Sequence, residues 1–162
     1  MILTEPIKEY DEVWHDRATG QKFFLGSEFV SYAYMEKVEE VQLIVCCCGA
    51  SGVPPTHSSL LHIPFRDSPY SEDQPSIEWL IRAIRAAGEL HNGKNIFVHC
   101  AEGRNRSALF LALYLYEYHR ESFPDGMSQI VRHLREKRQR GLLQNSHFER
   151  LLADWALANK GI

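Results

Sequence analysis

The chain has 162 residues, 44% of them hydrophobic, which is enough to bury one core of common domain size, so we expect one domain over residues 1–162. Its formal net charge of −3 gives no electrostatic reason to expect nucleic-acid binding, which calls for a basic face. No apolar run approaches the roughly 18 residues of a membrane span, and Met1–Tyr10 lacks an apolar signal core. We therefore expect a cytoplasmic location, with the nucleus as the alternative.

Strands and helices alternate along the chain. The turn-forming stretch Asp16–Gly20 separates two β-rich segments and predicts a hairpin, and Ser27 is a candidate N-cap for the helix that follows it. We expect strands at Glu12–His15, Gln21–Leu25, Val41–Cys47, Leu60–Phe65 and Asn95–Val98. We expect helices at Glu28–Lys37, Ile77–Leu90, Ser107–Tyr116 and around Ile130–Leu134. This order predicts an α/β fold with a central, mostly parallel sheet of about five strands flanked by helices.

The segment Val98–Ser107 has the composition of a phosphate-binding loop built around a nucleophile. It lies between a short apolar strand and a long apolar helix, so its backbone N–H groups open onto a helix N-terminus, where an anion is favoured. Arg106 adds a two-pronged cationic clamp, and the same positive environment stabilises a thiolate at Cys100. Cys100 is therefore the candidate nucleophile, with a buried structural cysteine as the competing interpretation.

The candidate phosphate-binding positions lie between the nucleophile and the helix. Gly103 is in the middle of them, where a side chain would obstruct the approach of phosphate or where a positive φ is required. The set comprises Ala101, Glu102, Gly103, Arg104, Asn105 and Arg106.

The chain resembles a known family through this loop and beyond it. His99–Cys100 and Arg106–Ser107 match the His-Cys-x5-Arg-Ser/Thr signature of cysteine-dependent protein tyrosine phosphatases, and the chain looks more like their dual-specificity branch. Phe24–Ser27 resembles a strand end found early in these domains, and Ile63–Asp67 resembles the strand and loop that carry the general acid. Two further segments fall where the family has helices, Ile77–Leu90 and Phe148–Leu157.

The resemblance implies a reaction and its acid. Cys100 attacks phosphorus, Asp67 protonates the leaving oxygen, and water then hydrolyses the phosphocysteine, with no metal and no cofactor. Asp67 begins a polar loop after a strand, which is where the resemblance places the acid. Asp73 is the competing candidate, and either residue could instead be an exposed aspartate that caps the helix beginning near Ser76.

Two residues that flank the loop are candidates for supporting roles. Ser107 can donate a hydrogen bond to the cysteine sulfur and ease its departure, or it can cap the start of the helix. His99 is expected to orient the loop rather than transfer protons, and its alternative is an ordinary buried histidine.

Arg104 bears on the substrate class. Dual-specificity relatives commonly have an apolar or aromatic residue at this position, whereas several related lipid phosphatases have a basic residue. A second cation beside Arg106 would favour a polyanionic substrate. The alternative is that Arg104 belongs to the solvated surface. Ala101 occupies the position where many of those lipid phosphatases have lysine, and Glu102 adds a negative charge. We therefore expect a phosphoprotein phosphatase for phosphotyrosine, phosphoserine and phosphothreonine. A phosphoinositide phosphatase and a non-catalytic phosphate-binding module are the alternatives.

Three consecutive cysteines, Cys46–Cys48, end a strand that the resemblance places beside the catalytic loop. Cys48 has roughly the position of a cysteine that pairs with the nucleophile in some relatives. A reversible disulfide from Cys48, or from Cys46, to Cys100 is therefore our hypothesis, and three small buried residues are the alternative.

The run Arg132–Arg140 is basic. On a helix, much of it would form one solvated face, and the alternative is a docking site for an acidic partner or an anionic lipid.

Overall fold

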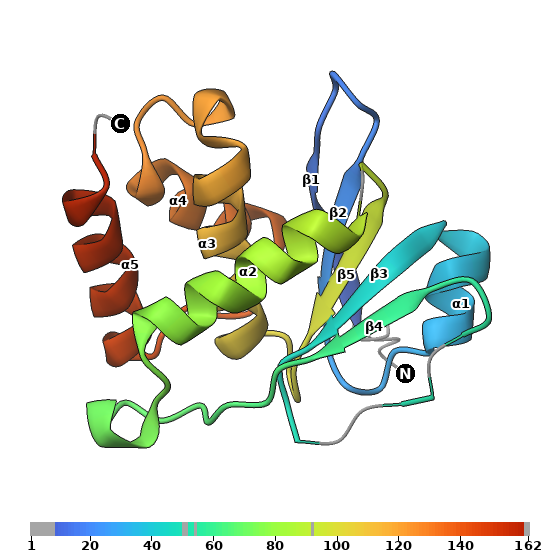
Figure 1. Cartoon of the computed structure of the whole chain (residues 1–162), viewed down its shortest axis with the longest axis horizontal. Coiled ribbons are helices and arrows are strands. Elements are labelled where there is room, and N and C mark those ends of the chain that lie inside the picture. The colour runs from blue at the N-terminus through green and yellow to red at the C-terminus, as the bar shows by residue number, and fades with distance from the viewer. Residues whose placement is uncertain (1–8, 50–51, 54, 92, 161–162) are drawn as a thin grey trace, which may run out of the picture.

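The centre of the fold is a five-stranded sheet in the order β1-β2-β5-β3-β4 (Figure 1). The computed structural model describes residues 9–49, 52–53, 55–91 and 93–160, so most of the N-terminal segment expected to lack a signal core lies outside the described residues. β1 pairs with β2 in the antiparallel direction, and the other neighbouring strands are parallel. The strands are β1 (Tyr10–His15), β2 (Lys22–Gly26), β3 (Val41–Cys46), β4 (Ser59–His62) and β5 (Asn95–His99).

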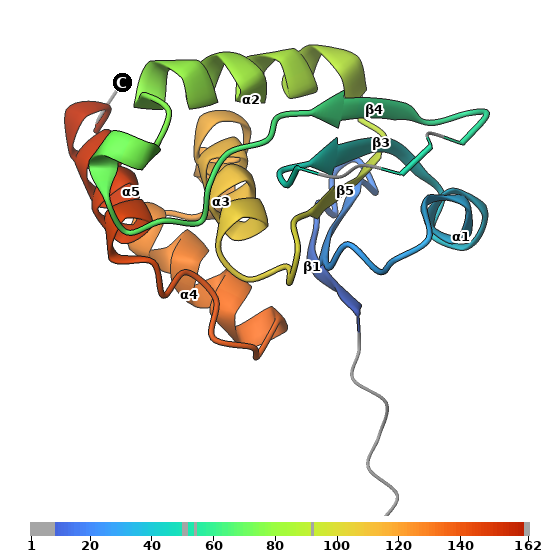
Figure 2. The same ribbon diagram turned by 90° about the horizontal axis from the view of Figure 1, so that it is seen from below.

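Helices cover both faces of this sheet. Figure 2 shows α1 on one face and the other helices on the opposite face. The helices are α1 (Tyr32–Val38), α2 (Ile77–His91), α3 (Arg106–Tyr118), α4 (Met127–Lys137) and α5 (Ser146–Ala158). Short 3-10 turns occur at Ser71–Asp73 and Arg120–Ser122. In the described part of the chain, no helix combines the length and the apolar character needed to cross a membrane.

The predicted α/β class and mostly parallel sheet are confirmed, and one helix start is wrong. We expected Ser27 to cap a helix from Glu28, but α1 begins four residues later at Tyr32. Ser31 is the actual cap, because its hydroxyl accepts the Tyr34 N–H at 3.2 Å. Ser27 instead starts a turn, accepting the Phe29 N–H at 3.2 Å. A serine before a helical pattern is thus ambiguous when a second serine follows one turn later.

Helix α3 explains why the segment after the loop is apolar on all sides. Every residue of Ser107–Tyr116 is buried, because α3 lies between the sheet and the helices α2, α4 and α5. Strand β5, which precedes the loop, lies between β2 and β3 and is therefore buried on both edges. The catalytic loop thus runs from a central, buried strand to a buried helix, and these two elements fix both of its ends.

The basic segment Arg132–Arg140 does not form a solvated face throughout. Much of the segment is exposed, as expected, whereas Arg138 is 0% exposed. Its guanidinium donates to the carbonyl oxygens of Gly103 at 2.8 Å and Glu102 at 3.1 Å, and to the Asp11 carboxylate at 2.8 Å. Buried carbonyl groups in a tight loop need donors, and here a side chain from the end of α4 supplies them.

Replacing Arg138 with methionine should lower the free energy of unfolding by about 3–5 kcal/mol, because the change removes the buried guanidinium that donates to the Asp11 carboxylate and to two loop carbonyls. Urea unfolding followed by circular dichroism measures the effect. The control is Lys137→Met at the neighbouring exposed position, expected within about 0.5 kcal/mol of the parent. Equal unfolding midpoints for the two variants would show that the hydrogen bonds of Arg138 do not contribute to the stability of the fold.

Candidate active site

The loop from Cys100 to Asn105 packs its backbone against the end of β2. The Cys100 N–H donates to the Gly26 carbonyl oxygen at 3.4 Å, and the Ala101 carbonyl accepts the Glu28 N–H at 3.2 Å. Gly103 has a φ of +69°, and a Cβ there would lie 2.5 Å from the Gly26 oxygen. The positive φ expected at this position is therefore present, and the close approach of the Gly26 backbone is a second reason for a glycine there.

Cys100 lies buried at the base of this loop, 2% exposed, with its Sγ 3.3 Å from the Ser107 Oγ. Burial by itself raises the pKa of the thiol. The Ser107 hydroxyl, the backbone N–H groups of Ser107 and Arg104, and the charge of Arg106 act in the opposite direction and bring the pKa below its ordinary value. The same groups that favour the thiolate would face an anion bound above it.

Arg106, the first residue of α3, reaches across to the acid-bearing loop. Its Nη1 donates to the Phe65 carbonyl at 3.3 Å, while its Nε is buried and makes no hydrogen bond with any part of the chain that the structure describes. A cavity of about 410 Å³ lies beside it, lined by Gly49, Pro64, Phe65, Arg66, Asp67 and Arg106. The predicted clamp and the predicted acid thus border one cavity.

Two asparagine side chains hold the Asp67 carboxylate. Asn105 donates from Nδ2 to one oxygen at 3.0 Å, and Asn145 donates from Nδ2 to the other at 2.9 Å. Asp73 is placed differently, since it accepts the Ser68 hydroxyl at 2.9 Å within its own loop. Of the two acid candidates, Asp67 is therefore the one bound to the catalytic loop.

Asn145 was not singled out from the sequence. Its Oδ1 accepts the N–H groups of His147 at 3.0 Å and Phe148 at 3.2 Å, so it caps α5, and its Nδ2 reaches Asp67 as well as the Ser68 carbonyl. The sequence shows an asparagine just before a helical pattern, and this pattern indicates an N-cap but not a contact with Asp67. The second role depends on a loop 78 positions earlier in the sequence.

His99 is enclosed by aromatic residues behind the loop. Burial lowers the pKa of its imidazole to about 4, so the ring is neutral at pH 7. The Tyr32 hydroxyl lies 2.5 Å from its Nε2, and the Phe97 ring stacks on it with centroids 5.4 Å apart. A neutral, tightly held ring suits a positioning role, which stays a prediction. Tyr32 is a second residue that the sequence did not reveal.

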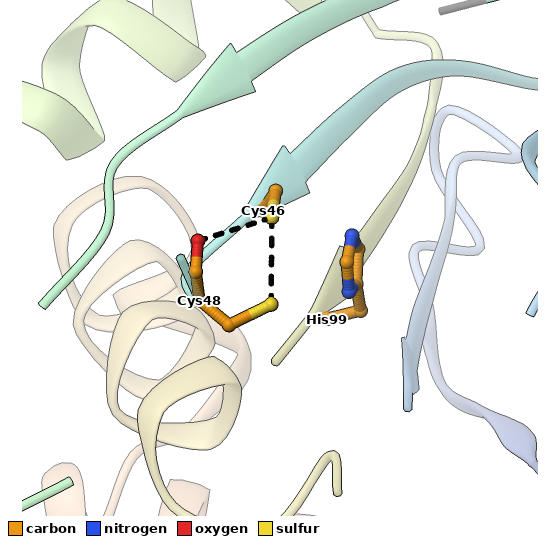
Figure 3. Close-up of side chains that lie close together, drawn as sticks. All are labelled: Cys46, Cys48 and His99. Atoms are coloured by element: carbon orange, nitrogen blue, oxygen red, sulfur yellow. Dashed lines mark hydrogen bonds between the residues drawn. The ribbon is translucent and has the colours of Figure 1, made fainter. Parts of the chain in front are cut away.

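The three consecutive cysteines do not share one environment. The Sγ atoms of Cys46 and Cys48 lie 3.6 Å apart, and both face His99 (Figure 3). Burial raises the pKa of the Cys48 thiol to about 12, and burial also raises that of Cys47. Cys100 lies close enough to influence both thiols. The disulfide hypothesis for Cys48 and Cys100 stays a prediction.

The loop's remaining charged residues form the outer rim. Arg104 donates from Nη1 to a Glu102 carboxylate oxygen at 3.1 Å, and both side chains are partly exposed. The Arg104 carbonyl accepts the Leu143 N–H at 3.0 Å, which joins this rim to the segment before α5. Glu102 thus partly neutralises the extra cation that the sequence singled out.

A larger cavity of about 1100 Å³ opens elsewhere, between α3, α4 and α5. None of the predicted catalytic or phosphate-binding residues lines it. Its size therefore says nothing about the chemistry of the loop.

Comparison with known proteins agrees with this geometry. The family model described as "Dual specificity phosphatase, catalytic domain" matches residues 23–157. Dual specificity protein phosphatase 26 of Bos taurus is 31% identical over 87 residues, which make up 51% of this chain and 38% of that relative. The curated relative is thus matched over well under half of its length.

Two solved structures show the same fold at low sequence identity. A mouse dual specificity phosphatase complexed with zinc tungstate has a TM-score of 0.74 at 19% identity, covering 98% of this chain and 93% of that chain. PTPMT1 in complex with PI(5)P has a TM-score of 0.64 at 18% identity, covering 90% and 94%. Fold and loop together define the class of cysteine-dependent phosphatases. Within this class, the chain belongs to the dual specificity phosphatase family.

Replacing Ser107 with alanine should raise the pKa of the Cys100 thiol, because the thiolate loses a hydrogen bond that lowers it. Iodoacetamide reacts with the thiolate form. The pH at which labelling is half-maximal should therefore move to a higher value. Labelling at Cys100 is followed by mass spectrometry from pH 4 to 10, a window spanning about three units either side of neutrality.

Ser122→Ala, at an exposed serine of the second 3-10 turn, is the matched control and should keep the parent midpoint. An unchanged or lower midpoint for Ser107→Ala would contradict the assigned interaction.

Proposed function

We propose that this chain hydrolyses phosphate monoesters on proteins, on phosphotyrosine and on phosphoserine and phosphothreonine, through a phosphocysteine intermediate. One observation carries the proposal: the Cys100 sulfur accepts hydrogen bonds from the backbone N–H groups of Arg104 and Ser107, and the charge of Arg106 also favours the thiolate. Such a set of donors is complementary to phosphate oxygens. The buried Nε of Arg106 is a further donor suited to one of them.

In the first step, the Cys100 thiolate attacks phosphorus in line with the leaving oxygen. The phosphorus–sulfur bond forms as the phosphorus–oxygen bond breaks, and Asp67 gives its proton to the departing alkoxide or phenoxide. Arg106 and the loop N–H groups hold the three remaining oxygens and the charge they carry. Asn105 and Asn145 fix the Asp67 carboxyl at the edge of the cavity.

In the second step, water replaces the sulfur. Asp67, now ionised, accepts a proton from water, whose oxygen attacks phosphorus while the phosphorus–sulfur bond breaks. The Ser107 hydroxyl, 3.3 Å from Sγ, stabilises the thiolate that leaves, and inorganic phosphate is released. The chain's own residues thus account for every proton in the cycle.

A phosphoinositide is the second candidate substrate. Arg104 at the exposed rim favours it, since a second cation can meet a second phosphate, and PTPMT1, which has the same fold, was solved in complex with PI(5)P. Glu102, bonded to Arg104, reduces this advantage. The phosphoprotein therefore stays the first candidate.

The cytoplasmic location and the acidic partner stay proposals. Arg132 and Lys137 of the basic segment are exposed and available to such a partner, whereas Arg138 is buried.

Phosphate release should depend on Cys100. A phosphotyrosine peptide, a phosphothreonine peptide and a soluble phosphoinositide are compared under reducing conditions, with Cys100→Ser as the control. Turnover of the peptides that is lost in Cys100→Ser supports the proposal. Preferential turnover of the phosphoinositide would contradict it and identify the phosphoinositide as the substrate. A protein that binds phosphopeptide without Cys100-dependent release is a binding module instead.

Asp67→Asn should lower kcat by about 10²–10⁴-fold and leave KM nearly unchanged, because the amide cannot donate the proton to the leaving oxygen. Steady-state kinetics on the phosphothreonine peptide measure both constants, since an alkoxide needs the proton more than a phenoxide does. Asp73→Asn is the matched control in the same loop. If Asp73→Asn carries the loss and Asp67→Asn does not, the acid is Asp73.

A further inference from the structure

Behind the catalytic loop, two thiols and an imidazole meet in one cluster. Cys46 ends β3, His99 ends the neighbouring strand β5, and the two residues are paired in the register of the sheet. The Sγ atoms of Cys46 and Cys48 and a ring nitrogen of His99 all lie within 4.8 Å of one another (Figure 3). All three residues are buried, and none is more than 3% exposed.

The backbone explains which cysteines take part. Cys46 is the last residue of β3 and Cys48 lies in the bend that follows, and together they bring both Sγ atoms close to a ring nitrogen of His99. Cys47 lies between them in the sequence and is not a member of the cluster. The backbone at Cys48 is itself held, because its carbonyl oxygen lies 2.7 Å from the His62 Nε2.

The sulfur–sulfur distance matches that of a tetrahedral metal site. With zinc–sulfur bonds of about 2.3 Å, two thiolates on one ion lie about 3.8 Å apart. The Sγ atoms of Cys46 and Cys48 are 3.6 Å apart, so little movement is needed to share an ion. Two thiolates and one imidazole form a soft ligand set that prefers Zn²⁺ to Mg²⁺ or Ca²⁺.

An oxygen donor borders the same space. The Tyr32 hydroxyl lies 2.5 Å from the His99 Nε2 and also interacts with the Cys46 thiol. It can orient the imidazole as an outer partner or leave the fourth position to water.

We propose that Cys46, Cys48 and His99 bind one Zn²⁺ ion behind the catalytic loop, without the participation of Cys100. Binding releases the two thiol protons to solvent, and two sulfur–zinc bonds and one nitrogen–zinc bond form. The ion would fix His99, whose carbonyl accepts the Cys47 N–H at 2.8 Å and which immediately precedes the nucleophile. The site is therefore distinct from phosphate binding but mechanically connected to the reactive loop.

Cobalt titration of the Cys100→Ser protein tests the proposal. Co²⁺ is the probe, because its thiolate charge-transfer band and its visible ligand-field bands report both sulfur ligation and tetrahedral geometry. We expect both sets of bands, saturation at one ion per chain and their removal by Zn²⁺, with a non-thiol reductant present. The Cys100→Ser background removes the nucleophile as a ligand. An absent thiolate band would overturn the proposal.

Three alanine variants in that background locate the ligands. Cys46→Ala and Cys48→Ala should each lose the tetrahedral spectrum, whereas Cys47→Ala, the matched control, should keep it. Circular dichroism establishes that each variant is folded. Persistence of the bands without Cys46 or Cys48, or their loss without Cys47, would contradict the assignment.

A second measurement does not need the alanine variants to fold. If the site exists, Zn²⁺ binds the folded chain and should raise the thermal midpoint of Cys100→Ser, and a chelator should reverse the shift. A midpoint that Zn²⁺ leaves unchanged or lowers contradicts the proposal.

Discussion

A loop that turns its N–H groups inward toward one anion must turn carbonyl groups outward, and in this chain the outward carbonyls of Glu102 and Gly103 need donors of their own. Arg138 resolves the conflict by donating to the carbonyls of Glu102 and Gly103, while the Asp11 carboxylate balances its charge. On the other side, the loop lies against Gly26 so closely that Gly103 cannot carry a side chain. The position of the Cys100 sulfur depends on these two supports, because the loop has no regular secondary structure of its own.

The proposed acid, Asp67, is held by hydrogen bonds from two asparagine side chains. Asn145 uses its oxygen to start α5 and its nitrogen to hold Asp67, so the orientation of a helix and the orientation of a carboxylate are set by one side chain. Asn105 completes the arrangement from within the catalytic loop. The nucleophile loop and the acid loop, which are far apart in sequence, are thus joined through amide hydrogen bonds rather than through ion pairs.

The sequence predicted the features that are encoded locally. The strand, loop and helix around Cys100 and the need for glycine at position 103 follow from composition and spacing, and the α/β fold follows from the alternation of elements. The burial of Arg138 could not be predicted, because a basic run gives no sign of which member will be buried against a loop 35 positions away. Asn145 and Tyr32 escaped notice for the same reason: each acts through a partner that only the tertiary structure brings near. The start of α1 was missed because two serines compete for one cap.

Strand β1 contributes to the support of the catalytic loop although it lies outside the segment that the family model matches. The family match begins at residue 23, beyond β1, yet Asp11 on that strand is the counter-ion of the buried Arg138. A truncation that kept only the matched segment would leave a guanidinium charge in the interior without its carboxylate, directly behind the catalytic loop. The N-terminal hairpin therefore supplies a charge that supports the catalytic loop, although none of its residues lines the cavity beside Arg106.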